Sequence, residues 1–186
     1  VYFHGVFDGA GYNIDGVTAK GWDGAMFYSI GGTIKNVSFT NVTLGKKAAL
    51  FNEHQNGNAA RFENIYIHCT SVESVALENG TKQYTGFFTV ETTDWNNYFK
   101  NIYIEIDANN TTDGTPIYLT KYCGKLNING MYAVGAGVQE AVSAGDWGAG
   151  VYAGGVYETR ATMKSANIDF SGWDDTIWTT DADGLP

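Results

Sequence analysis

The chain has 186 residues, of which 44% are hydrophobic, so it is long enough and apolar enough to bury the core of a single domain over residues 1–186. Eleven Lys and Arg against twenty Asp and Glu give a formal net charge of −9, which disfavours binding to nucleic acid or to an anionic membrane surface. Twenty-four glycines beside two prolines indicate repeated tight turns without proline kinks. The abrupt start at Val1, within a predicted strand, leads us to expect a fragment of a longer chain.

A six-residue pattern recurs along the chain: an apolar residue, any residue, Asn or Gly, an apolar residue, any residue and a further apolar residue. Its copies occupy residues 14–19, 34–39, 62–67, 99–104, 128–133 and, most weakly, 163–168. The period of two and the β-branched and aromatic residues predict strands. The variable spacing suits stacked coils whose loops bulge from a turn. We therefore predict an all-β fold, a right-handed parallel β-helix (solenoid) of about six coils with variable loops.

Three further features complete the predicted architecture. A small residue followed by two large apolar ones precedes several copies, at residues 24–27, 48–51 and 85–88, and predicts a second strand in each coil. Residues 137–160 are rich in glycine and predict a loose excursion. Residues 170–186, which include Trp173 and Trp178, predict a C-terminal cap over the exposed end of the last coil.

The third position of the pattern marks a bend, because Asn and Gly tolerate left-handed backbone angles. Asn36, Asn64 and Asn101 occupy it in three successive copies, and we expect them to form an asparagine ladder that hydrogen-bonds to the backbone of the next coil. The outward position before the bend alternates in charge through the first four copies, at Asp15, Lys35, Glu63 and Lys100. This alternation favours one register of the coils over a slipped one.

The outward position after the bend holds tyrosine in three successive copies, at Tyr66, Tyr103 and Tyr132. A column of rings on a flat sheet suits sugar recognition, because the apolar face of a pyranose packs on an aromatic plane. Trp95, in a neighbouring insertion, is a further candidate for this binding face. The alternative is that long loops, the C-terminal tail or a neighbouring subunit cover the column.

The residues that could hold metals are few. Cys69 and Cys123 are not spaced as a metal-binding pair, and Cys69 continues the apolar alternation of its strand, which predicts a core thiol. Calcium has one candidate place, the acidic C-terminal end with Asp181 and Asp183, although a solvated acidic end is the simpler interpretation. We predict no other metal or cofactor.

Several motifs resemble those of known β-helix proteins. Residues 3–14 (FHGVFDGAGYNI) resemble the G-x-F-D-G-x-G-x-x-I opening of pectate-lyase-like right-handed β-helix proteins. Residues 34–37 (IKNV) are similar to coils of bacterial surface proteins with GLUG-type repeats, and residues 178–186 are similar to the ending that follows such repeats. The resemblance implies an architecture and no single activity, since the superfamily includes lyases, hydrolases, adhesins and phage tailspikes.

The functional interpretation follows from this architecture. The catalytic sets of polygalacturonase-like and pectate-lyase-like enzymes are not recognisable, since there is no Gly-His-Gly and Arg160 and Lys164 stand four apart. The leading interpretation is a non-catalytic module of an extracellular, cell-surface or virion-surface protein, for attachment or display, with a polysaccharide or host-surface glycan as ligand. A polysaccharide-processing lyase or glycoside hydrolase and a purely structural spacer are the alternatives. Other domains of the same chain and further copies in a homo-oligomer are the protein partners considered; no nucleic acid and no membrane are expected.

Overall fold

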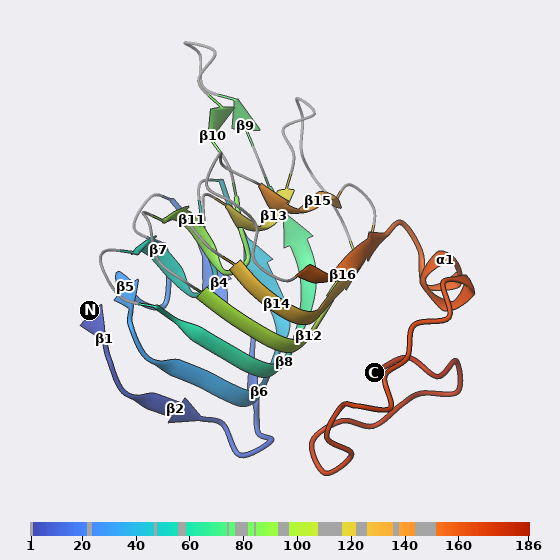
Figure 1. The fold of residues 1–186 in the computed structure, drawn as a ribbon. Helices are drawn as coiled ribbons and strands as arrows, with labels where there is room; N and C mark the ends of the chain where they lie inside the picture. The colour runs from blue at the N-terminus through green and yellow to red at the C-terminus, as the bar shows by residue number, and fades with distance from the viewer. Residues whose placement is uncertain are drawn as a thin grey trace.

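The main sheet of the protein, in the computed structural model, contains eight strands, and its path runs β16–β14–β12–β8–β6–β2 with every neighbouring pair parallel. These strands are β2 (Val6–Asp8), β6 (Thr33–Leu44), β8 (Arg61–Val72), β12 (Asn97–Ile106), β14 (Leu126–Val134) and β16 (Tyr152–Tyr157). Two short strands, β3 (Asn13–Asp15) and β4 (Thr18–Ala19), also pair with β6. Figure 1 shows the strands stacked one above another in chain order.

The structure describes residues 2–21, 24–46, 48–55, 59–73, 75–76, 82–83, 85–92, 97–107, 117–121, 126–135, 138–143 and 152–186.

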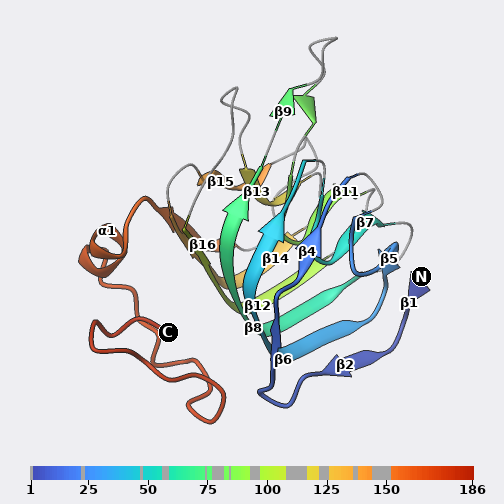
Figure 2. The same ribbon diagram turned by 180° about the vertical axis from the view of Figure 1, so that it is seen from behind.

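Between successive main strands the chain passes through a second set of short strands. Three parallel pairs make up this set: β1 (Tyr2–Phe3) with β5 (Ser29–Ile30), β7 (Asn52–Gln55) with β11 (Thr89–Thr92), and β13 (Ile117–Lys121) with β15 (Val138–Ser143). A small antiparallel pair, β9 (Val75–Ala76) and β10 (Lys82–Gln83), stands apart from both sets (Figure 2). The fold is thus all-β, with most of its strands parallel.

The predicted second segments of the coils lie side by side, as expected. The Met26 and Phe27 backbone N–H groups donate to the carbonyls of Leu50 and Phe51, each at 3.0 Å. The Leu50 N–H in turn donates to the carbonyl of Phe87 at 3.0 Å. Residues 24–27, 48–51 and 85–88 therefore form neighbouring layers, but they are not the strands we predicted, since β5, β7 and β11 begin only after them, at Ser29, Asn52 and Thr89.

The core lies between the main sheet and these second segments. In the main sheet Ile34, Phe62, Phe99 and Ile128 follow one another across neighbouring strands, in the register that the sequence pattern predicts. Phe62 and Phe99 stack at 5.2 Å between ring centroids, and Phe51 stacks on Phe88 at the same distance. Burial of these columns supplies the main stabilising free energy, because each strand shields the apolar side chains of its neighbour.

Cys69 belongs to this core, as its alternation predicts. Its thiol is buried and donates to the Ser71 carbonyl at 3.3 Å. Burial raises the pKa of the thiol to about 12, so it stays protonated. Cys123 lies outside the described residues.

The first copy of the sequence pattern has a different register from the one predicted. Phe7 pairs with Ile34, whereas Ile14, which we aligned with Ile34, pairs with Phe39. The reason is an early bend: Ala10 and Gly11 both have left-handed backbone angles, with φ of 50° and 79°. Asp8 rather than Asp15 therefore begins the alternating charges, and its carboxylate lies 3.1 Å from Lys35 Nζ.

The C-terminal third also differs from the prediction. The described parts of residues 137–160, which we expected to be a loose excursion, contain β15 and β16, and β16 adds a strand to the main sheet beside β14. Gly154 is required there by close packing: a Cβ on it would lie 2.1 Å from the Met131 carbonyl oxygen. The weak sixth copy at 163–168 is wrong, since helix α1 (Arg160–Ser165) occupies its start, capped by the Thr159 side chain. Within the described ranges, no helix combines the length and apolarity needed to cross a bilayer.

Candidate functional site

The asparagine ladder lines one bend of the main sheet. Asn36, Asn64 and Asn101 all have left-handed backbone angles, with φ of 53° or 54°. Asn101 Nδ2 donates to Asn64 Oδ1, and Asn64 Nδ2 donates to Asn36 Oδ1, each at 2.9 Å. We had expected these side chains to hydrogen-bond to the backbone; in the structure they hydrogen-bond to one another. Asn36 Nδ2 ends the chain of donors on the Asp8 carboxylate at 3.1 Å, which polarises the amides in one direction.

The tyrosine column (Tyr66, Tyr103 and Tyr132) stands beside this ladder on neighbouring strands. Tyr103 has no exposed surface, and Tyr66 and Tyr132 are half-buried. The rings of Tyr66 and Tyr103 are nearly parallel, with 20° between their planes and 5.9 Å between centroids. Both hydroxyls donate to the Glu105 carboxylate at 2.9 Å, which fixes the orientation of the rings.

The C-terminal segment, residues 158–186, covers most of the column. Tyr132 contacts Phe170 and Trp173 with centroid distances of 5.3 and 6.2 Å, and Met163 and Leu185 join the same buried cluster. Figures 1 and 2 show this segment beside the bends of the main strands. Trp173 and Trp178, which we expected in a cap, pack over the outward-facing tyrosines of the main sheet. The physical reason is that stacked rings on a sheet are a large apolar surface that the chain's own aromatic residues can bury.

One cation links the segment to the main sheet, and a second forms an ion pair within the segment. Arg160 forms ion pairs with Glu105 of β12 and with Asp181 of the segment itself. Lys164 Nζ lies 2.7 Å from Asp183 Oδ1. The two aspartates that we considered for calcium are therefore each paired with a basic side chain. Among the described residues no group of three or more His, Cys, Asp or Glu side chains gathers as a metal site.

Burial and the neighbouring Glu105 carboxylate raise the pKa of Tyr66 and Tyr103 well above the usual tyrosine range. For both groups burial is the larger cause. Their phenols thus remain neutral hydrogen-bond donors over the whole physiological pH range. Their role at this site is to provide aromatic surface and to bind Glu105.

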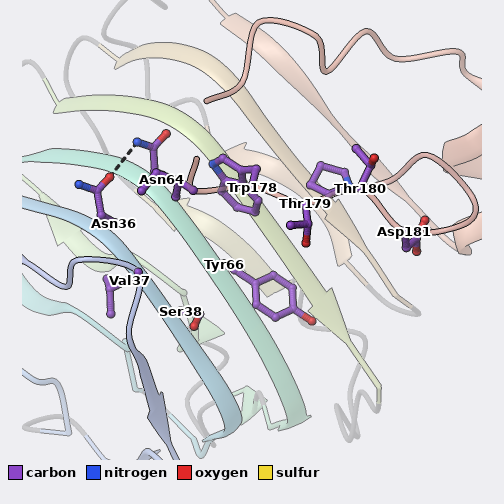
Figure 3. A pocket seen from close by; sticks show the side chains of 12 residues that line it. Asn36, Val37, Ser38, Asn64, Tyr66, Trp178, Thr179, Thr180 and Asp181 are labelled. Carbon is purple, nitrogen blue, oxygen red and sulfur yellow. Dashed lines mark hydrogen bonds between the residues drawn. The ribbon is translucent and has the colours of Figure 1, made fainter. Parts of the chain in front are cut away.

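An open groove remains where the C-terminal segment crosses β6 and β8, with a volume of about 360 Å³. From the main sheet it is lined by Asn36, Ser38, Asn64 and Tyr66, and from the segment by Trp178, Thr179, Thr180 and Asp181. Figure 3 shows Tyr66 between Ser38 and Thr179, and Asn64 between Asn36 and Trp178. Aromatic surface with a few amides and hydroxyls is typical of small-ligand sites, whose volumes run from about 300 to 1,000 Å³.

Of the proposed binding residues, the structure brings only Tyr66 into the groove. Trp95 lies outside the described residues. The sequence pattern missed Trp178 and Ser38: Trp178 because we assigned it to a cap, and Ser38 because it breaks the run of tyrosines. The Trp178 indole N–H, at the wall of the groove, is buried and has no acceptor among the described residues.

Comparison with known proteins finds no match for this chain among protein-family models, curated proteins or solved structures.

Proposed function

We propose that the stacked strands are the coils of a right-handed parallel β-helix. Supporting this, the long strands β6, β8, β12 and β14 are parallel neighbours in chain order, and a short strand of the second set lies between each pair in sequence. Crossover connections between parallel strands are almost always right-handed, which sets the hand of the proposed coil. The opening of the chain, with its resemblance to pectate-lyase-like proteins, agrees with this architecture.

The module serves attachment or display on an extracellular, cell-surface or virion-surface protein, and it binds a glycan without cleaving it. The observation that carries this proposal is the open groove between the asparagine ladder and the C-terminal segment. Its wall combines aromatic rings with amide and hydroxyl groups, the combination that packs against a sugar ring and pairs with its hydroxyls. A rigid, stacked scaffold holds these groups in fixed positions.

A glycan array tests this function. The intact, fluorescently labelled chain should be retained by a small set of related glycans, and the same chain after thermal unfolding should not. The bound glycans should be recovered unchanged in length. Retention by no glycan, or the appearance of shorter products, would contradict the proposed function.

A further inference from the structure

The outward column of the main sheet changes from tyrosine to serine at the groove. Register places Ser38, Tyr66, Tyr103 and Tyr132 at equivalent positions of β6, β8, β12 and β14. One side of the Tyr66 ring therefore faces Tyr103, and the other faces Ser38, whose side chain is much smaller. Neighbouring coils are about 4.8 Å apart, so the column lacks one ring at this place.

We propose that a pyranose ring binds in this gap, stacked on the free face of Tyr66 and above Ser38, as the ligand of the attachment function proposed above. Figure 3 shows the arrangement: the Tyr66 ring lies beside Ser38, and the segment from Trp178 to Asp181 passes on the outer side. The sugar takes the place that a further tyrosine would fill. The Tyr66 hydroxyl is held by Glu105 at 2.9 Å, so the ring needs little ordering when the sugar binds.

Polar groups surround the gap on two sides. The Asn36 and Asn64 amides each donate one N–H within the ladder, and the second N–H of each can donate to a ligand. The Ser38 hydroxyl donates to Asn13 Oδ1 at 3.1 Å, which leaves its oxygen lone pairs as acceptors. Thr179 and Thr180 are exposed at the opposite wall. Sugar hydroxyls, which both donate and accept, match this mixture of groups.

The charges at the groove select a neutral sugar. No Lys, Arg or His is among the described residues that line it, and Asp181, the acidic one, is already paired with Arg160. The net charge of −9 adds a repulsion for anions. A uronic or sialic acid would bring a carboxylate to a place without a cation, which costs binding free energy.

Titration calorimetry tests the site. Cellotetraose, maltotetraose and chitotetraose serve as neutral probes, and tetragalacturonate serves as the acidic probe. We expect at least one neutral probe to bind and the acidic probe to bind at least about tenfold more weakly. Ser38→Tyr should fill the gap and weaken binding at least about tenfold, while it extends the tyrosine column and preserves the fold. Tyr66→Ala removes the ring on which the sugar stacks and should also weaken binding at least about tenfold.

Tyr2→Ala is the matched control, because Tyr2 is an exposed tyrosine that lies outside the groove. Its affinity should equal that of the native chain. If Ser38→Tyr bound the neutral probe as tightly as the native chain, or if tetragalacturonate bound as tightly as the neutral probes, the gap would not be a neutral-sugar site. Glycan binding on the array would in that case still support the attachment function. Failure on the array itself would overturn the attachment function and this site together.

Discussion

At the scale of single residues, the bends of the main sheet depend on asparagine for two reasons. Like glycine, it tolerates left-handed backbone angles, and unlike glycine, it has a side-chain amide that forms hydrogen bonds. Asn64 adopts a φ of 53°, which costs other side chains about 1–2 kcal/mol. Its amide also links Asn101 to Asn36 through two hydrogen bonds. Gly130 continues the column of left-handed residues but cannot continue the ladder.

Replacement of Asn64 separates these two contributions. Asn64→Ala should lower the free energy of unfolding by about 2–4 kcal/mol, because it loses both amide bonds and because alanine tolerates the left-handed region less well than asparagine. Asn64→Gly should lose about 1 kcal/mol less, because glycine accepts that backbone angle. Urea unfolding monitored by circular dichroism measures both. Equal stabilities of the two variants would contradict a role for the backbone angle.

At the scale of elements, the C-terminal segment determines which outward aromatic residues remain accessible. Trp173 is central to it, with ring centroids of Phe170 and Trp178 at 5.1 and 4.6 Å. It also lies over the bend of β14, since a Cβ on Gly130 would meet its indole nitrogen at 3.3 Å. The ion pairs of Arg160 are partly exposed and contribute less than this packing.

Trp173→Ala should therefore loosen the segment without unfolding the sheet. We expect faster hydrogen–deuterium exchange in residues 160–186, and unchanged exchange in β8 and β12, because the core on the other face of the sheet stays intact. Asp175→Ala, at an exposed position of the same segment, is the control and should exchange like the native chain. If β8 and β12 exchanged faster as well, the segment would be an integral part of the core.

The elements also show how far the sequence could be interpreted. The copies at 34–39, 62–67, 99–104 and 128–133 could be predicted because their inner residues alternate with a period of two and are buried against their equivalents. Helix α1 was missed because its capping box uses Thr162 where Glu or Gln is the usual signal. The groove could not be predicted, because alternation tells which side chains point outward but not which segment covers them.

At the scale of the whole molecule, the acidic composition makes stability depend on pH. The backbone N–H of Ala10, and then the Asn36 amide and Lys35, hold the pKa of Asp8 below its ordinary value. The Thr40 hydroxyl and the Asn41 amide lower the pKa of Asp15 in the same way. Unfolding releases these carboxylates to their ordinary pKa, so the unfolded chain binds more protons in acid.

These carboxylates should therefore make their full contribution to the free energy of unfolding above about pH 5. That free energy should decrease as the pH falls below about 4. Asp8→Asn cannot titrate at this position, so its stability should decrease less steeply over that range. Thermal unfolding at a series of pH values measures both slopes. Identical slopes for the native chain and Asp8→Asn would contradict the role given to the Asp8 carboxylate.

The gap beside Tyr66 is the place where the main sheet, the C-terminal segment and the proposed ligand meet. A crystal structure of the chain soaked with a neutral tetrasaccharide that binds in calorimetry tests it most directly. We predict a pyranose ring stacked on the face of Tyr66 that is turned toward Ser38, with Trp173 still packed against Tyr132 and Tyr103 still buried. A sugar bound elsewhere, or one that displaces the C-terminal segment and stacks on Tyr103, would contradict the account.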